Sequence, residues 1–264
     1  MKMKFFFLTI IFILSLASEI SAQSKINTKI EAGLINANMK GDIKNLISTS
    51  DFTEDLGYSK FNASYFSVEA VHTYDYFPNV YIGFFNTKES SSTTLDKTIE
   101  IADFTYSSSN ISSSIDYNVL NLLLYENFLI KGSSKTSLYG SRFYPGDLEF
   151  RLGINIKYIN WKYNIIDKTA FSSKSSWIKV NEFIPLPYLG FRYYRYKFSM
   201  YGNISALSFM DAKSISAEAG IDYRFVKGLH LSLGYIYEDF DVVEDNDTVY
   251  YQIDGIKLGF KYIF

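Results

Sequence analysis

Residues 255–264 read GIKLGFKYIF, and this ending decides the fold. Every second residue from Ile256 to Phe264 is apolar, and the chain stops on an aromatic side chain. The residues between them are glycines, lysines and one isoleucine. A period of two predicts a β-strand whose faces meet two different surroundings, one apolar and the other small or charged.

The same alternation recurs throughout the chain. Clear copies lie at 148–158, 198–206, 215–225 and 229–238, and weaker copies at 28–37, 64–74, 79–88, 113–126 and 184–195. Each segment is close to the ~9–11 residues that a tilted membrane strand needs. We therefore predict an all-β fold, an antiparallel up-and-down transmembrane β-barrel of about ten strands. The pattern leaves the strand number open between eight and twelve.

The N-terminus has the features of a secretory signal peptide. Lys2 and Lys4 precede an uncharged apolar run at 5–16, and a small, polar segment follows at 18–22. This order predicts a signal peptide over 1–22, cleaved near Ala22, and a mature barrel domain over 23–264. The run is shorter than the ~20 apolar residues of a spanning helix, and no later run approaches that length.

Connections between the expected strands alternate in length. Short turns are expected at 76–79, 194–197 and 226–228, and longer polar stretches at 38–62, 88–112, 162–182 and 241–249. Outer-membrane barrels have short periplasmic turns and longer extracellular loops. Segment 127–147 reads as a long periplasmic connection, with a further hairpin as the alternative.

Aromatic residues favour a membrane barrel over a soluble β-sandwich, which is the competing interpretation. The chain has 23 Tyr and 23 Phe, and membrane strands concentrate such residues at the two lipid–water interfaces. The expected strands place them at the short-turn ends (Tyr74, Tyr76, Tyr193, Phe225, Tyr262, Phe264) and at the long-loop ends (Tyr158, Tyr163, Tyr237, Tyr250).

Charged residues occupy the other face of the expected strands. Nine of them are the candidate lumen-facing charges: Glu149, Arg151, Lys157, Arg192, Glu218, Asp222, Arg224, Lys257 and Lys261. The wider set on this face adds Lys29, Glu31, Glu69, Asp116, Glu126 and Glu238. Acids and bases are nearly balanced, and buried charges must pair or stay hydrated. A narrow lumen filled by ion pairs is therefore expected, whereas a selective pore would show a ring of one sign.

Several segments resemble a functionally uncharacterised family of small Gram-negative outer-membrane barrels. They are YFPNV (76–80), LPYLGF (186–191), GLHLSLGY (228–235) and the terminal GFKYIF (259–264), whereas 127–147 looks like an insertion. The resemblance implies an outer-membrane location in the cell envelope, with the lipid bilayer and lipopolysaccharide as partners. It also implies that Tyr262 and Phe264 form an assembly signal that is read by the barrel-assembly machinery.

Little in the sequence points to chemistry. The net charge of −2 and the absence of cysteine argue against nucleic-acid binding and thiol chemistry. Only His72 and His230 are present, both expected at the periplasmic end and without a nucleophile motif. Acidic residues crowd 241–247 without calcium-loop spacing, so a solvated loop is favoured over a Ca²⁺ site.

We therefore expect no catalytic residues, no cofactor and no metal, and a monomer that does not bind nucleic acid. The expected function is a non-enzymatic structural or surface-interaction role carried by the extracellular loops. The alternative is a narrow, porin-like channel for small hydrophilic or amphipathic solutes.

Overall fold

The computed structural model describes residues 26–45, 48–72, 77–101, 104–107, 110–132, 145–169, 175–209, 212–244 and 247–264. The expected signal peptide, its cleavage near Ala22, and Tyr74 and Tyr76 lie outside these ranges. Within the described ranges, no helix is long and apolar enough to cross a membrane.

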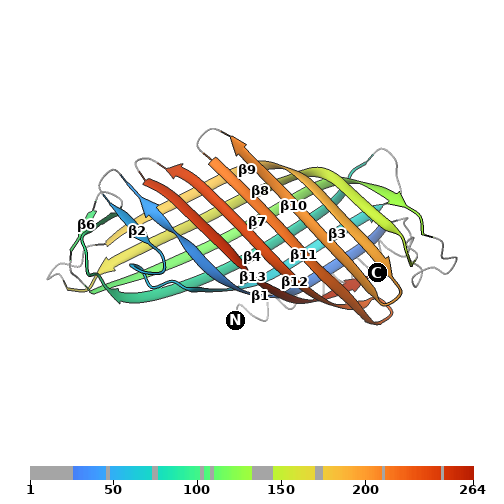
Figure 1. Cartoon of the computed structure of the whole chain (residues 1–264), viewed down its shortest axis with the longest axis horizontal. Helices are drawn as coiled ribbons and strands as arrows, with labels where there is room; N and C mark the ends of the chain where they lie inside the picture. Colours follow the sequence, from blue (N-terminus) through green and yellow to red (C-terminus); the bar gives the residue numbers. More distant parts are fainter. Residues whose placement is uncertain are drawn as a thin grey trace.

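Ten long antiparallel strands form a closed barrel (Figure 1). Each strand pairs with its neighbours in chain order, and β13 pairs with β1 to close the sheet. The predicted up-and-down barrel of about ten strands is thus confirmed. The strands are β1 (Ile26–Lys44), β3 (Lys60–His72), β4 (Asn79–Thr94), β7 (Asn110–Ile130), β8 (Leu148–Asp167), β9 (Ser175–Arg195), β10 (Phe198–Phe209), β11 (Ala212–Val226), β12 (Leu229–Glu244) and β13 (Asp247–Ile263).

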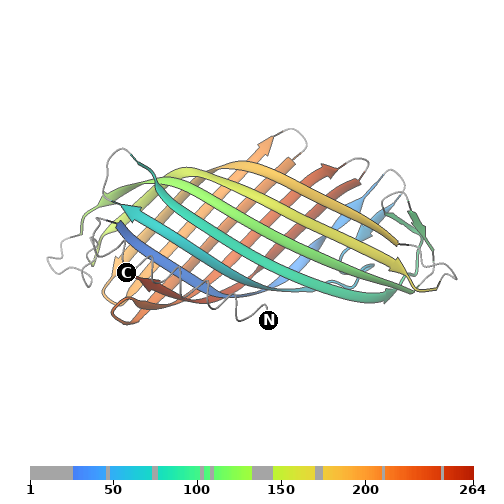
Figure 2. The same cartoon turned by 180° about the vertical axis from the view of Figure 1, so that it is seen from behind.

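The two ends of the barrel differ. At one end the described chain starts and finishes: Lys29 pairs with Ile263, and the backbone N–H of Phe264 donates to the Thr28 carbonyl at 3.0 Å. At the other end lie three short strands, β2 (Thr49–Asp51), β5 (Ile99–Ile101) and β6 (Phe104–Tyr106), as Figures 1 and 2 show. We call the half with the chain ends the proximal half and the other the distal half.

Tight turns join strands at the proximal end, as predicted. Residues 196–197 connect β9 to β10, and residues 227–228 connect β11 to β12. Tyr196 and Gly228 take positive φ values of 35° and 80°, the left-handed backbone that such turns require. The connection between β7 and β8 falls at 131–147, within the predicted segment 127–147. The alternative of a further hairpin concerns residues 133–144, which lie outside the described residues.

Strands continue far into the segments predicted to be loops. β4 runs to Thr94, β7 starts at Asn110, β8 runs to Asp167 and β9 starts at Ser175. The prediction of loops over 88–112, 162–182 and 241–249 was therefore wrong for much of their length. Serines and charges on the outward positions diluted the alternation there. β8 has 20 residues, about twice what a membrane span needs.

On β1, β8, β9 and β13 the two faces of the barrel wall exchange character about halfway along the strand. In the proximal part of β13, Lys257 and Lys261 are buried inside, while Leu258 and Phe260 are exposed outside. In its distal part Tyr251 is buried inside, and the outward positions are polar. β8 and β9 show the same exchange. The proximal half is apolar outside and charged inside, whereas the distal half is polar outside and apolar inside.

An apolar core fills the distal half. Phe52, in the segment after β2, is fully buried and packs against Trp161 and Tyr163 with ring centroids 6.1 and 6.4 Å apart. Tyr58 from the same segment donates to the Ser113 hydroxyl at 2.9 Å. Burial raises the pKa of Tyr58 to about 12, so its hydroxyl stays neutral. This end of the barrel is packed like the interior of a soluble protein.

Large apolar side chains on the outside of the proximal half form a continuous surface, which we call the apolar band. Its exposed members are Leu34, Ile82, Phe84, Leu120, Phe150, Leu152, Ile154, Phe183, Leu189, Phe191, Met200, Ile204, Ile221, Leu233, Ile256, Leu258 and Phe260. Soluble monomers rarely expose so large an apolar patch. Of the aromatic residues expected at the long-loop interface, Tyr163 is instead fully buried in the distal core, because it falls on an inward position of β8.

Candidate functional site: the ion-pair network inside the barrel

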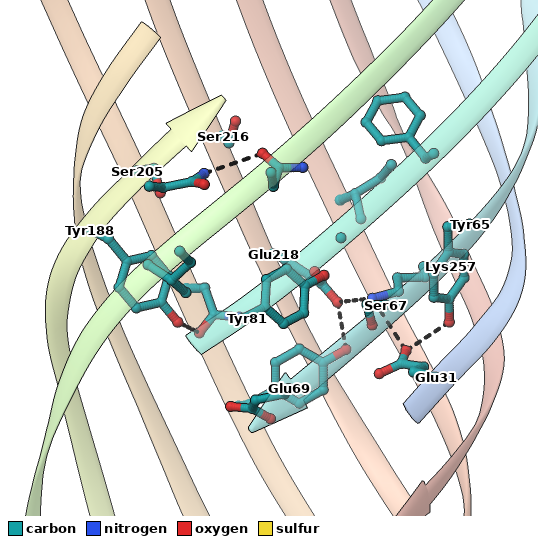
Figure 3. A pocket seen from close by; sticks show the side chains of 18 of the residues that line it. Glu31, Tyr65, Ser67, Glu69, Tyr81, Tyr188, Ser205, Ser216, Glu218 and Lys257 are labelled. Carbon is teal, nitrogen blue, oxygen red and sulfur yellow. Dashed lines mark hydrogen bonds and ion pairs between the residues drawn. The ribbon is translucent and has the colours of Figure 1, made fainter. Parts of the chain in front are cut away.

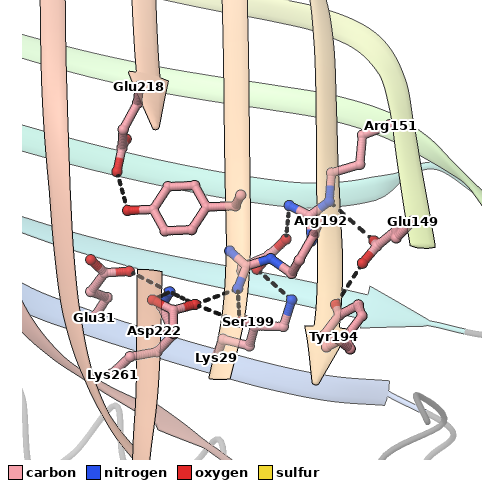
Figure 4. A network of polar contacts seen from close by, with 12 residues as sticks. Lys29, Glu31, Glu149, Arg151, Arg192, Tyr194, Ser199, Glu218, Asp222 and Lys261 are labelled. Atoms are coloured by element: carbon pink, nitrogen blue, oxygen red, sulfur yellow. Dashed lines mark hydrogen bonds and ion pairs between the residues drawn. The ribbon is translucent and has the colours of Figure 1, made fainter. Parts of the chain in front are cut away.

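Twelve charged side chains fill the interior of the proximal half and pair with one another in the described part of the chain. Figure 4 shows most of this network. Six are acidic and six are basic: Glu31, Glu69, Glu149, Glu218, Asp222, Glu238, Lys29, Arg151, Lys157, Arg192, Lys257 and Lys261. The network is therefore neutral when all members are ionised, and it contains no ring of one sign.

The first cluster is centred on Glu69 of β3. Its carboxylate oxygens lie 2.8 Å from Lys29 Nζ and 2.9 Å from Arg151 Nη1. Because β4 and β7 separate β3 from β8 in the sheet, the Glu69–Arg151 pair reaches across the lumen. Arg151 Nε also lies 3.0 Å from Glu149, whose other oxygen accepts from the Tyr194 hydroxyl at 2.6 Å.

The second cluster is centred on Asp222 of β11. Lys261 Nζ lies 2.8 and 2.9 Å from its two oxygens, and Arg192 pairs with the same carboxylate. Ser199 donates to it at 3.3 Å and accepts from Arg192 at 3.2 Å. These contacts tie β9, β10, β11 and β13 together through their side chains, in addition to the backbone ladder.

Glu31 of β1 extends this cluster across the junction at which β1 pairs with β13. Its oxygens lie 3.1 Å from Lys261 Nζ and 3.2 Å from Lys257 Nζ. Lys257 in turn lies 2.9 Å from Glu218. The seam between the first and last strands is thus held by ion pairs as well as by backbone hydrogen bonds.

Lys157 marks the distal limit of the network. Its ammonium pairs with Glu238 and donates to the Ser216 hydroxyl. The next inward residues on the same strands, Ile159 and Phe240, are buried members of the apolar core. On β8 the change from charged to apolar interior therefore takes place within one step, whereas on β12 the core member Ile236 already lies on the proximal side of Glu238.

Pairing is essential because the charged side chains of the network are almost completely buried. Glu149, Lys157 and Asp222 are each at most 1% exposed, and an uncompensated ion in such a site costs several kcal/mol. Among the described atoms, Arg151 Nη2 and Arg192 Nε are buried without a partner. Both arginines line the cavity described below, whose polar walls suit bound water.

Tyrosines complete the network, and glycines make room for them. Tyr65 donates to Glu31 at 2.7 Å, and a Cβ at Gly259 would lie 2.0 Å from the Tyr65 hydroxyl oxygen. Tyr201 likewise donates to Glu218 at 2.7 Å. Sequence reasoning missed the tyrosines as network members. The signal was available, since Tyr65 shares its face of β3 with Glu69.

A cavity of about 170 Å³ lies between the network and the distal core (Figure 3). Glu31, Lys257 and Tyr65 line one side of it. Ile35 and Ile236 line it too and also belong to the distal core. The cavity has room for a few water molecules or one small solute, and packed side chains lie beyond it on the distal side.

The nine predicted lumen-facing charges all lie on inward positions. Eight of them enter the network, together with Lys29, Glu31, Glu69 and Glu238. The ninth, Arg224, is half-buried near the proximal turn, where its backbone N–H donates to the Lys197 carbonyl at 2.8 Å.

Two residues of the wider set lie on the opposite face from the one predicted. Asp116 and Glu126 point outward on β7, because their neighbours Tyr117 and Tyr125 are buried inside. Leu120, Leu122 and Leu124 lie on one face of β7, and Leu123 lies on the other beside a single asparagine, so the alternation there could not show which face is internal. The prediction that Asp116 and Glu126 lie on the lumen face was therefore wrong.

The remaining candidates do not assemble into a reactive site. His72 Nε2 lies 2.9 Å from the Pro78 carbonyl oxygen, and His230 lies in register between Arg224 and Lys261. The described residues contain no cluster of three or more potential metal ligands. In the predicted acidic loop, residues 241–244 and 247–249 are strand, and 245–246 lie outside the described residues.

The expected assembly signal lies at the proximal end of the barrel wall. Tyr262 is 42% exposed on the outward face of β13. Its ring centroid lies 4.7 Å from that of Phe264 in an edge-to-face contact. Both rings are therefore placed beside the chain end that closes the barrel.

Searches against protein-family models and curated proteins find no match. Among solved structures, the outer membrane protease OmpT from Escherichia coli is 12% identical, with 90% of this chain and 96% of that chain covered and a TM-score of 0.49. The translocator domain of the autotransporter NalP from Neisseria meningitidis is 11% identical (97% and 96% covered, TM-score 0.44). The attachment invasion locus protein Ail of Yersinia pestis is 11% identical (91% and 99% covered, TM-score 0.35). The solved structures that this chain resembles are thus small Gram-negative outer-membrane β-barrels.

Proposed function

We propose that this chain is a monomeric integral outer-membrane protein with a sealed barrel, which carries a β-structured head above the bilayer for surface interaction. The observation that carries the proposal is the exchange of faces halfway along the strands. It divides one continuous barrel into a part suited to lipid and a part suited to water.

The proximal half has the surface of a membrane barrel. Its apolar band faces outward, while its charges face inward and pair. In lipid, every backbone polar group must be satisfied within the protein, and a closed barrel does this. In water the same band would be a strong aggregation surface.

Two different fillings support a sealed lumen. The ion-pair network occupies the proximal interior, and the apolar core occupies the distal interior. A conducting pore needs a continuous hydrated path, and the apolar core interrupts such a path. The distal half lifts its end of the barrel well beyond the bilayer, where exposed residues are available to partners.

A narrow channel is the second candidate function, and the cavity is the observation that favours it. Planar-bilayer recording of the purified barrel separates the two. We expect no stable unitary conductance from the wild-type protein. Discrete steps, with an ion selectivity that shifts in Arg192→Gln or Arg224→Gln, would instead support the channel.

Surface labelling tests the orientation of the barrel. The chain has no cysteine, so single cysteines report cleanly. Ser92→Cys, exposed on the distal part of β4, should react with a membrane-impermeant maleimide on intact cells. Lys197→Cys, exposed in a proximal turn, is the matched control and should react only after the outer membrane is opened. The reverse pattern would contradict the proposal.

We further propose that the protein is not an enzyme and that Tyr262 and Phe264 serve as the assembly signal. The first proposal is supported by what the described residues place beside the two histidines: the Pro78 carbonyl oxygen beside His72, and Arg224 and Lys261 in register beside His230. None of these is a nucleophile that a histidine could activate. For the second, Phe264→Ala should reduce the amount of barrel that is inserted in cells, while the purified variant still refolds in detergent.

A further inference from the structure

Two neighbouring rows of polar side chains cross the outward face of β4, β7, β8 and β9. In the first row, Asn86, Asn118, Asn160 and Asn181 are paired in register. In the second row, one step toward the distal end, Lys88, Asp116, Lys162 and Lys179 are paired in the same way. We call the eight residues the amide–lysine strip.

The amides of the strip are held in place, and its ammonium groups are available. Asn86 Nδ2 donates to Asn118 Oδ1, and Asn160 Nδ2 donates to Asn181 Oδ1, both at 2.5 Å. The three lysines are exposed, and within the described ranges none of them forms an ion pair. They surround a single carboxylate, that of Asp116, which accepts from Asn118 Nδ2 at 2.7 Å. The strip therefore carries a net positive charge that has no partner in the described part of the protein.

The outward face on the far side of the barrel has a different character. On β12 and β13, Tyr235 donates to Asp254 at 2.9 Å, and Tyr237 donates to Asp239 at 3.1 Å. Lys213 of β11 is already engaged with Asp239 at 3.2 Å. Among the described residues, the β4–β9 side thus places three exposed lysines without an ion pair in adjacent register positions, whereas Lys213 on the far side is already paired.

The surroundings of the strip define a sequence of chemical environments. On its proximal side lies the apolar band, with Phe84, Leu120 and Phe183 exposed. On its distal side lies Trp177, the next outward residue of β9 beyond Lys179 toward the distal end, and its side chain is 68% exposed. Along the barrel wall a ligand would meet hydrocarbon-like side chains, then amides, then ammonium groups, then an indole ring.

We infer that the amide–lysine strip binds the headgroup of a phosphorylated glycolipid of the outer leaflet. Acyl chains would lie on the apolar band, sugar hydroxyls and amides would meet the asparagine row, and phosphates would pair with the lysines. The indole of Trp177 offers a flat apolar face to a sugar ring. This inference rests on the proposed outer-membrane location and adds to it a ligand class and a binding site.

The natural tryptophans provide the assay. Trp161 is buried in the distal core and Trp177 is exposed beside the strip, and the chain has no other tryptophan. In a Trp161→Phe background, Trp177 emission reports on the strip alone. The purified, folded barrel in detergent micelles is titrated with bisphosphorylated lipid A, with the same lipid A after removal of its phosphates, with phosphatidylglycerol and with inorganic phosphate.

The test variant replaces Lys88, Lys162 and Lys179 with glutamine. Its matched control replaces Lys40, Lys44 and Lys213 with glutamine, which removes the same charge from the outward face of β1 and β11. Each lysine near an anionic surface contributes about fivefold in affinity, so the triple strip variant should bind bisphosphorylated lipid A on the order of 100-fold more weakly. The affinity of the control variant for bisphosphorylated lipid A should stay within about twofold of that of the Trp161→Phe protein with all its lysines.

Three results would overturn the inference. They are equal weakening in the control variant, equal binding of the dephosphorylated lipid, and equal binding of phosphatidylglycerol. Competition by inorganic phosphate at lipid concentrations would also count against it, because that would indicate an isolated anion site. All variants are first checked for heat-modifiable migration on gels. A folded, membrane-inserted barrel that fails to bind lipid A disproves the strip alone, whereas loss of folding or insertion of the wild type would disprove the proposed function.

Discussion

The proximal and distal halves of this barrel are built from the same strands but are stabilised in different ways. In the proximal half, ion pairs such as Glu69–Arg151 hold the interior, and apolar side chains cover the outside. In the distal half, an apolar core around Phe52 and Trp161 holds the interior, and the outside is polar. The comparison shows that a strand need not keep one environment on each face. Alternation sets which residues share a face, and the solvent outside sets what that face must be.

Disrupting the charged interior of the proximal half should destabilise the barrel most. Asp222→Asn leaves Lys261 and Arg192 without their shared carboxylate in a site that is 1% exposed. We expect the free energy of unfolding to fall by about 3–5 kcal/mol. Urea unfolding of the barrel in micelles, followed by tryptophan emission, measures this. The control Asp116→Asn removes an outward carboxylate and should change stability by less than ~0.5 kcal/mol. Equal small losses in both variants would mean that the ion pairs contribute little.

The distal core should respond locally. Phe52→Ala removes a fully buried ring that contacts Trp161 and Tyr163, and we expect a loss of about 3 kcal/mol. Hydrogen exchange should increase in the distal parts of β1, β7 and β8, with the proximal parts protected as before. The exposed Phe77→Ala serves as the control. If exchange increased throughout the barrel, the two halves would have to be one cooperative unit.

A smaller effect is expected where backbone and side chain meet closely. A methyl group at Gly259 would overlap the Tyr65 hydroxyl, so Gly259→Ala should cost about 1–3 kcal/mol. Tyr65→Ala removes the overlap but also the hydrogen bond to Glu31. The double variant should therefore lose less than the sum of the two single losses. Strict additivity would show that the contact between Tyr65 and Gly259 does not matter.

The mildest change in stability is expected at the boundary between the two halves. Lys157 and Glu238 form the last ion pair before the apolar core, so replacing both by apolar residues moves the boundary by one step. Lys157→Met combined with Glu238→Leu should stay within about 1 kcal/mol of wild type, whereas Glu238→Leu alone should cost about 3 kcal/mol. A double variant as unstable as the single one would mean that the distal core cannot extend into the network.

Much of the proximal half could be predicted from the sequence. The alternation over 255–264 identifies a strand with one apolar and one charged face, and Lys257 and Lys261 share the face that proves internal. The distal half could not be predicted in the same way. There serines such as Ser112 and Ser114 stand outside, and Ile111 and Ile115 are buried inside. A rule that assigns apolar residues to the lipid-facing side predicts these distal segments to be loops. In them the apolar residues face inward and the polar residues face outward.

The network itself was predictable only as a set of charges. Periodicity places Glu149 and Arg151 on one face, but it cannot show that Arg151 crosses the lumen to Glu69, because that pair depends on barrel closure. The tyrosines were overlooked because aromatic residues were assigned to the membrane interfaces. Tyr163, which was expected at an interface, lies on an inward position of the distal half and packs the core together with Tyr117.

The exchange of faces also determines how deeply the barrel can sit in the bilayer. A displacement by two residues along the strands would preserve which side chains point outward. It would nevertheless carry Asp254 of β13 or Lys162 of β8 toward the hydrocarbon, where the cost of a charge rises with depth, to about 2–4 kcal/mol for a lysine at the midplane. Displacement in the other direction would bring Phe260 and its neighbours into water. The pattern of outward side chains along the barrel wall thus fixes the depth at which the barrel sits in the bilayer.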